Sequence, residues 1–212
     1  SLGWDGYSRP DIAGDLVALV HHLGGPAVII GHSISGGAAT APESITGVIE
    51  LAPFTRAVSY SVGGLLTNKS YRSAVMLLGQ IVMTGSLKAW EKYLDLAYPT
   101  KPADWDTELD RIKDTLREPG RMKALQAMCK SKPTDAGEQL KNVRCPVLVI
   151  EGSADPDWVD PRAEGEKIIA DLPTGLGELA VLDGVGHYPH AQAPEQTLAL
   201  ALPFLARTLP GA

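Results

Sequence analysis

The sequence predicts an α/β protein in which helices cover a parallel β-sheet. Two observations support this fold class. Short apolar runs that are typical of buried strands recur along the chain, at residues 27–30, 47–52, 147–150 and 179–182. Helical patterns separate these runs, and this alternation is typical of a parallel sheet. A third feature, a long stretch that contains helical patterns only, predicts an insertion within the sheet.

The first helix is expected at residues 11–23. Its apolar positions fall on one helical face and are expected to point inward, and they are Ile12, Leu16, Leu19, Val20 and Leu23. Pro10 and Asp11 suit a helix start, and Gly24-Gly25 suits its end.

The next run, 27–30, is apolar at every position, as in a strand buried on both faces. At the other end of the chain, a closing helix is expected at about 195–209. Its Leu198, Leu202 and Leu205 are expected to face inward, and Pro203 is expected to bend it.

The insertion is expected to form a helical cap at residues 54–143, with the core at 1–53 and 144–212. Four helices are predicted in it, at 71–83, 87–96, 105–116 and 121–130. Its apolar residues at helical spacing are expected to form core rather than an adaptable pocket, and they include Met76, Leu77, Leu78, Met83, Met122 and Met128.

Composition excludes several classes of function. The 212 residues carry a net charge of −6, and no run of Lys or Arg stands out, so a nucleic acid is not an expected partner. No apolar run approaches the ~20 residues of a membrane span. The two cysteines are too few for a disulfide framework and lack the spacing of a metal site. Cytoplasm is the favoured location, although the sequence opens at Ser1 rather than Met.

Gly31-His32-Ser33-Ile34-Ser35 lies between the first strand and a helix-compatible segment. It resembles the nucleophile elbow G-x-S-x-G of the α/β-hydrolase family, with Ser35 in place of the second glycine. The resemblance implies that Ser33 is a nucleophile raised above the sheet by a strained turn. A Gly/Ser-rich turn without chemistry is the alternative, and Ser35 is a weaker candidate for the nucleophile.

A serine hydroxyl needs a base to take its proton, and that base needs an orienting carboxylate. The segment 145–156 resembles the strand and loop that deliver the family's acid, which falls on Asp155. The segment 183–190 resembles the loop of the family's catalytic histidine, which falls on His187. Ser33, Asp155 and His187 therefore occur in the family's order of nucleophile, acid and base.

Other residues are weaker candidates for these roles. Asp157 and Asp160 are expected to be solvated loop carboxylates. Glu50 in the second strand is a reserve candidate for the acid, because some family members take their acid from this strand. Asp155 itself could instead have a structural role, as a helix-capping or turn residue before Pro156.

The resemblance covers nearly the whole chain, with two departures. The family has strands upstream of the loop that Asp5–Pro10 resembles, so the core is expected to lack its N-terminal strands. In the family, one of the missing connections carries a backbone donor of the oxyanion hole, so the Ile34 N–H is the donor that remains identifiable. The loss of one such donor typically costs about 2.7 to 4 kcal/mol of transition-state stabilisation. In addition, Pro42 limits the helix after the elbow to about two turns.

The resemblance implies hydrolysis of a small carboxylic ester or related acyl compound through an acyl-enzyme, without cofactor or metal. Phe54, Trp158 and Tyr188 are the expected pocket residues. A non-catalytic ligand-binding or signalling relative, or a cofactor-free perhydrolase, is the alternative.

Without upstream strands, the strand at 27–30 is expected to form an apolar sheet edge. Neither Lys nor Pro interrupts this strand, so the chain is expected to self-associate through it.

Overall fold

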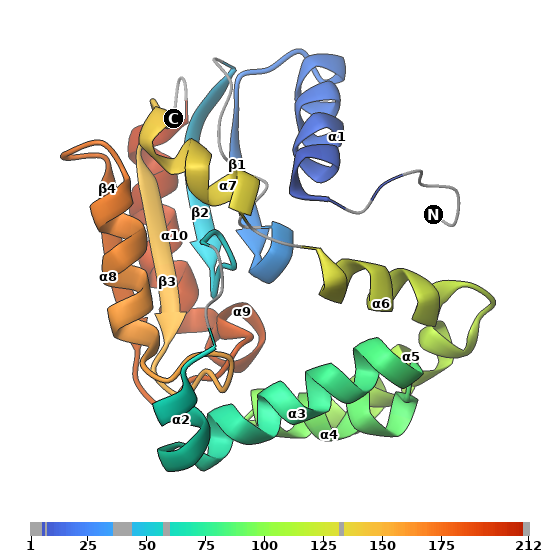
Figure 1. Cartoon of the computed structure of the whole chain (residues 1–212). Helices are drawn as coiled ribbons and strands as arrows, with labels where there is room; N and C mark the ends of the chain where they lie inside the picture. The colour runs from blue at the N-terminus through green and yellow to red at the C-terminus, as the bar shows by residue number, and fades with distance from the viewer. Residues whose placement is uncertain (1–5, 7, 36–43, 57–59, 132–133, 210–212) are drawn as a thin grey trace.

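The structure is a computed structural model, and it describes residues 6, 8–35, 44–56, 60–131 and 134–209. Within this part of the chain, four parallel strands form one sheet in the order β1-β2-β3-β4, which confirms the predicted fold class (Figure 1). The strands are β1 (Ala27–His32), β2 (Ile45–Leu51), β3 (Val147–Gly152) and β4 (Gly177–Leu182).

Helices cover both faces of the sheet. On one face, α1 (Arg9–His22) and α8 (Pro161–Asp171) enclose a cluster that includes Val48, Val149 and Ile168. On the other face, α10 (Pro194–Thr208) follows the short α9 (Pro189–Gln192) and packs on Ile49, Ile150 and Leu182. The central strands are therefore buried on both sides, which explains why their sequences are largely apolar. The edge strand β1 was expected to be buried on both faces as well, but Ile30 within it is 55% exposed.

The helix α1 begins at Arg9, two residues before the predicted start, and turns part of its predicted face to solvent. The Ser8 side chain and Asp11 form a reciprocal capping box at its start. Val20 is buried, whereas Leu19 is 51% exposed and Leu23 is 74% exposed. The expectation that all its apolar residues point inward is therefore wrong at its C-terminal end, where α1 lies beside the edge strand β1.

The helix α10 is rotated relative to the prediction. Leu198 and Leu202 are exposed, and the buried residues are Thr197, Ala201, Phe204 and Thr208. A Cβ on Gly47 of β2 would lie 3.0 Å from the Phe204 ring, so this glycine makes room for the largest side chain of the helix. The inward threonines are tolerated because their hydroxyls donate to the carbonyls of Pro189 and Phe204.

In the described part of the chain, six helices lie between β2 and β3, and most of them gather beyond the carboxyl ends of the strands (Figure 1). The six helices are α2 (Val62–Thr67), α3 (Lys69–Thr84), α4 (Leu87–Ala97), α5 (Trp105–Arg117), α6 (Arg121–Lys130) and α7 (Thr134–Gln139). The helices α3, α4, α5 and α6 share a hydrophobic cluster that includes Ile81, Tyr93 and Leu94. Two 3-10 turns complete the described elements, η1 (Ser33–Ser35) and η2 (Leu140–Asn142).

The four predicted helices of the insertion are present, and its boundaries stay a prediction. Leu140 and Val143 fall inside the predicted insertion and belong to the hydrophobic cluster on the sheet. Met76 and Met83, which were expected in the core, are 68% and 84% exposed on α3. None of the helices in the described residues has the length and apolar character needed to cross a bilayer.

Candidate active site

The strand β1 leads directly into Ser33, the predicted nucleophile. Ser33 opens the 3-10 turn η1 with a φ of 53°, in the left-handed region that few residues other than glycine adopt. Its carbonyl accepts a hydrogen bond from the Phe54 N–H at 3.1 Å. The strained turn that the elbow motif predicts is thus held in place by the loop that follows β2. The short helix predicted after the elbow lies mostly outside the described residues.

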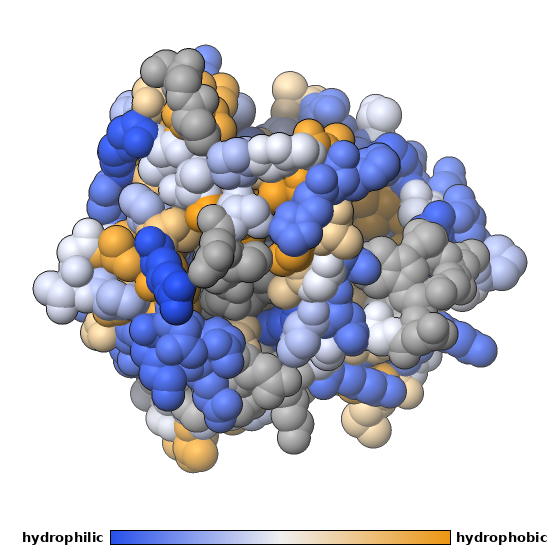
Figure 2. All heavy atoms as spheres, turned by 90° about the horizontal axis from the view of Figure 1, so that it is seen from above, coloured by the Kyte–Doolittle hydropathy of each residue, from blue (hydrophilic) through white to orange (hydrophobic). Residues whose placement is uncertain are grey.

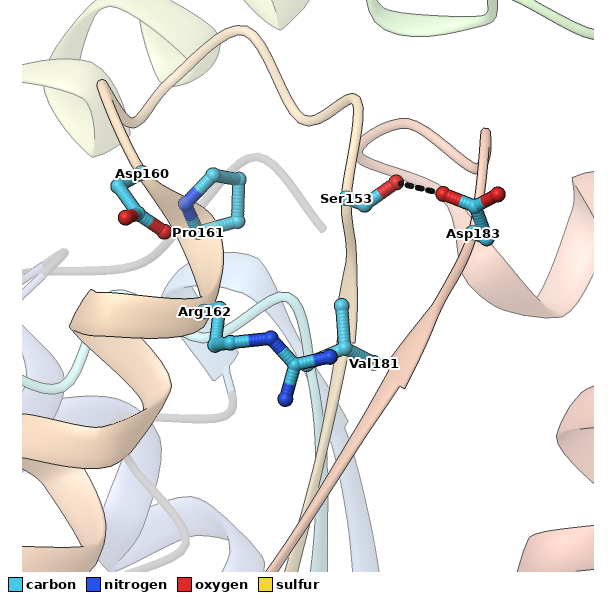
Figure 3. Close-up of a pocket in the computed structure, with 6 residues that line it drawn as sticks. All are labelled: Ser153, Asp160, Pro161, Arg162, Val181 and Asp183. Atoms are coloured by element: carbon cyan, nitrogen blue, oxygen red, sulfur yellow. Dashed lines mark hydrogen bonds between the residues drawn. The ribbon is translucent and has the colours of Figure 1, made fainter.

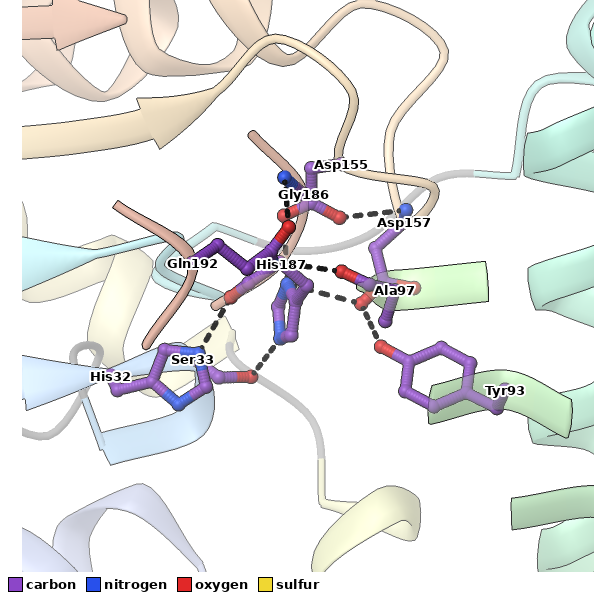
Figure 4. A network of polar contacts seen from close by, with 9 residues as sticks. All are labelled: His32, Ser33, Tyr93, Ala97, Asp155, Asp157, Gly186, His187 and Gln192. Carbon is purple, nitrogen blue, oxygen red and sulfur yellow. Dashed lines mark hydrogen bonds and ion pairs between the residues drawn. The ribbon is translucent and has the colours of Figure 1, made fainter. Parts of the chain in front are cut away.

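Three side chains from different loops form one chain of hydrogen bonds (Figure 4). His187 Nδ1 lies 2.7 Å from Asp155 Oδ2, and His187 Nε2 lies 2.9 Å from Ser33 Oγ. A carboxylate only accepts, so Nδ1 carries the proton and Nε2 is free to accept from the serine hydroxyl. This is the arrangement in which an imidazole takes a proton from a serine.

The acid loop and the histidine loop approach each other closely at the carboxyl ends of β3 and β4. A Cβ on Gly152 would lie 2.3 Å from the carbonyl oxygens of Val185 and Gly186. Only glycine allows this approach, which brings Asp155 within hydrogen-bond distance of His187 Nδ1. Both side chains are buried, at 3% exposure each.

Asp157 is not the solvated loop carboxylate that the sequence suggests. It is 7% exposed, and its Oδ2 lies 3.5 Å from His187 Nδ1. The Tyr93 hydroxyl of α4 donates to the same Oδ2 at 2.7 Å. The prediction is wrong because Tyr93 of α4 lies against this loop, a contact between distant residues that local sequence does not reveal. Asp160 is exposed and caps the start of α8 through a bond from the Ala163 N–H.

Burial and neighbouring charges change the pKa values of the site. Burial lowers the pKa of His187, but the charges of Asp155 and Asp157 outweigh it and raise that pKa above its ordinary 6.5. Burial also raises the pKa of Asp157. Burial lowers the pKa of His32 to about 3, so its ring is neutral and donates from Nε2 to the His187 carbonyl.

The three predicted pocket residues lie around His187. The rings of Phe54 and Trp158 are 4.8 Å apart, and Phe54 is 6.0 Å from the His187 ring. Tyr188 lies 5.2 Å from His187 and stacks at 4.3 Å on Tyr98, the C-cap residue of α4. Their contact with a substrate stays a prediction.

Three further candidates, Ile34, Ser35 and Glu50, are not part of the hydrogen-bond chain. Ile34 follows Ser33 in η1, and its oxyanion role stays a prediction. The Ser35 hydroxyl donates to the His32 carbonyl at 2.7 Å, as a turn residue does. Glu50 accepts from Thr55 at 3.3 Å within the buried sheet, so the structure brings Asp155 rather than Glu50 to His187.

Among the described residues, one group has the composition of a metal site. Ligand atoms of Asp155, Asp157 and His187 lie within 4.8 Å of one another. Asp155 Oδ2 and His187 Nδ1 are joined by the 2.7 Å bond, and the Tyr93 hydroxyl donates to Asp157 Oδ2. The other oxygen of this buried group, Asp157 Oδ1, has no hydrogen-bond partner among the described residues.

A hollow of about 390 Å³ lies beside β4 and contains no member of the hydrogen-bond chain (Figure 3). Its Ser153 hydroxyl donates to Asp183 and accepts from the Gly184 N–H, which is the pattern of a turn-stabilising residue. The hollow is lined by Ser153, Asp160, Pro161, Arg162, Val181 and Asp183.

Sequence reasoning missed the residues that join the helices between β2 and β3 to this site. The Ala97 carbonyl, at the end of α4, accepts from the His187 N–H at 3.0 Å and from Gln192 Nε2 at 3.1 Å. Arg9 is 3% exposed and donates to the Phe54 carbonyl and to Ser131. A buried arginine at a helix start has no sequence signal, because its partners lie 45 and 122 residues away.

Comparisons with known proteins agree with the fold. The chain resembles an esterase from Thermogutta terrifontis, with 21% identity, a TM-score of 0.66, and coverage of 97% of this chain and 74% of that one. It also resembles an esterase from Rhodococcus sp. ECU1013, with 18% identity, a TM-score of 0.70, and coverage of 96% and 74%. A bromoperoxidase from Bacillus anthracis gives 15% identity, a TM-score of 0.67, and coverage of 97% and 77%.

A search of curated proteins found no match to the sequence. The sequence model of the alpha/beta hydrolase family, in contrast, matches residues 1–200, which is most of the chain. The chain therefore belongs to the α/β-hydrolase family.

Proposed function

We propose that this protein is a serine hydrolase that cleaves a small carboxylic ester or related acyl substrate through an acyl-enzyme. The observation that carries the proposal is the continuous hydrogen-bond chain from Ser33 through His187 to Asp155, with Ser33 in a left-handed turn. Family membership and the two esterases of similar fold support a hydrolase.

Each residue has a defined step in this reaction. Ser33 Oγ attacks the acyl carbon while its proton passes to His187 Nε2, and Asp155 holds the imidazolium that forms. The imidazolium then gives its proton to the leaving alkoxide, and the alcohol departs. Water attacks the acyl-enzyme with His187 as base, which releases the acid and restores Ser33. The backbone N–H of Ile34 is the proposed donor to the oxyanion.

Two serines of the same turn allow a matched test of this role. Ser33→Ala is expected to abolish covalent labelling by a fluorophosphonate and to lower turnover of a nitrophenyl ester by about 10⁴-fold or more. Ser35→Ala loses only the bond to the His32 carbonyl, worth about 1 kcal/mol, so labelling should remain largely intact.

The outcomes separate the proposal from its alternatives. Labelling that survives Ser33→Ala would refute Ser33 as the nucleophile. If the unmodified chain shows no labelling and no ester turnover, the result would favour a non-catalytic ligand-binding relative. Formation of a peracid from a carboxylic acid and hydrogen peroxide would identify perhydrolysis by the same serine.

A further inference from the structure

We infer that helix α4 of the cap is a positioning element for His187, which it holds through Asp157 at the ring and through Ala97 at the backbone. The inference rests on the proposed role of His187 as the base. It assigns a function to a second carboxylate and a tyrosine that the triad does not contain.

The ring is held through Tyr93. Its hydroxyl donates to Asp157 Oδ2 at 2.7 Å, which fixes that oxygen 3.5 Å from His187 Nδ1. Asp155 Oδ2 lies closer to the same nitrogen, at 2.7 Å. Asp155 therefore takes the hydrogen bond, while Asp157 adds a second negative charge beside the imidazolium. The Asp155 carboxylate also accepts from the Asp157 N–H at 2.9 Å, so the two acids are fixed relative to each other.

The backbone is held through the last carbonyl of the same helix. Ala97 O accepts from the His187 N–H, and Gln192 joins that oxygen to the Gly186 N–H by donating to one and accepting from the other. A Cβ on Gly186 would lie 2.2 Å from Ala97 O, so the contact requires glycine. The carbonyls at a helix end need such partners, and here the histidine loop supplies them.

Both attachments come from one face of one helix. Tyr93 and Ala97 are four residues apart, so they lie on adjacent turns of α4, and both are buried (Figure 4). Any displacement of α4 from the core would therefore move the backbone and the ring partner of His187 together. We infer that α4 thereby sets the position and orientation of His187.

Several titratable groups surround this contact and enter its pH dependence. Asp155 and Asp157 are the carboxylates next to the ring, and the pKa of His32 is lowered so far that it adds no charge. The other groups that face His187 or Asp157 are Tyr93, Tyr188, His190, Cys129 and Glu151.

Asp157→Asn removes an anion beside the ring, so His187 should lose its proton at lower pH and the acidic limb of kcat/KM should move down. Tyr93→Phe removes the bond that favours the charged form of Asp157, so the limb should move in the same direction by less. In both variants kcat on the plateau should fall about tenfold, with KM within about twofold, because orientation of the base is lost.

Tyr71→Phe on α3 is the matched control, because its hydroxyl holds the Ser61 N–H within the cap and does not contact His187. NMR titration of the His187 ring measures the same shift without turnover, and thermal unfolding checks that each variant folds. An unchanged limb and ring titration in both variants, or an equal shift in Tyr71→Phe, would overturn the inference. Failure of the unmodified chain to react with a fluorophosphonate would instead refute the proposed function.

Discussion

His187 is fully buried, with two carboxylates on one side of its ring and the Ser33 hydroxyl on the other. Burial disfavours the imidazolium, whereas the carboxylates favour it, and the carboxylates prevail. In the proposed reaction this balance favours the state that forms when Ser33 attacks, because the ring then carries a proton. The same balance extends the protonated form of His187 to higher pH than in an ordinary histidine, because its pKa is raised.

The pH dependence of the reaction follows from this shift. A base must be neutral to accept a proton, so kcat/KM should rise as pH increases through the raised pKa of His187. The midpoint of this limb is expected above the ordinary histidine value of 6.5. Ester turnover measured from about pH 5 to about pH 10 would locate the midpoint. A flat profile, or a midpoint below that value, would contradict the raised pKa.

The three residues of the proposed triad were predictable because each lies in a local motif that is contiguous in sequence. Asp157 was not, although it stands two residues from Asp155. Its contact with Tyr93 joins residues that are 64 positions apart, because the fold packs α4 against the acid loop. Local sequence therefore predicted the three residues that the structure joins by hydrogen bonds, and it missed Tyr93 and Asp157 beside them.

Among the elements, the strands were predictable and the rotation of α10 was not. A strand in the interior of a parallel sheet is largely apolar, and such a run is visible without knowledge of its neighbours. The inward face of α10 is decided by the space above Gly47, which Phe204 fills. Leucines at helical spacing lie equally well on the neighbouring exposed stripe, so periodicity alone misplaced the face.

Two central strands each carry a buried carboxyl. Glu50 of β2 lies opposite Val149 of β3, so Glu151, two residues further along, projects from the same face of the sheet. Neither oxygen of Glu151 has a hydrogen-bond partner among the described residues, and Thr55 donates to Glu50. Burial raises the pKa of Glu50 to about 8 and that of Glu151 well above its usual range.

Stability should therefore fall as pH rises. An unfolded glutamate ionises near 4.5, and folded Glu50 ionises near 8, so between these values only the folded chain holds the proton. Between about pH 4.5 and about pH 8, the free energy of unfolding should therefore drop by up to about 1.4 kcal/mol per pH unit because of Glu50. Below about pH 4.5, Glu50 should cause no such drop. Urea unfolding of Glu50→Gln should show a shallower decline. Glu178→Gln is the control, because it alters only an exposed ion pair between Glu178 of β4 and Arg207 of α10. This variant should show the same decline of stability with pH as the unmodified chain. Parallel curves for all three proteins would refute the assignment.

Across the whole molecule, the two edges of the sheet differ in their protection. The last strand, β4, is covered on one face by α8, and its Glu178 pairs with Arg207. The first strand, β1, pairs on one side with β2, and Ile30 within it is 55% exposed. Seen from above, hydrophilic residues cover most of the visible surface, with apolar residues between them (Figure 2). The net charge of −6 opposes association only weakly at physiological salt.

We expect the 212-residue chain to self-associate through β1. The free N–H and C=O groups of an edge strand pair readily with a second copy, and neither lysine nor proline lies within Ala27–His32 to prevent it. Ile30→Lys places a charge on this edge at an exposed position and should shift the chain toward monomer in light scattering over a dilution series. Leu198→Lys adds the same charge at a similarly exposed position on α10, away from this edge, and should leave association unchanged. A chain that is monomeric at every concentration, or equal dissociation by both lysines, would show that β1 is not the contact.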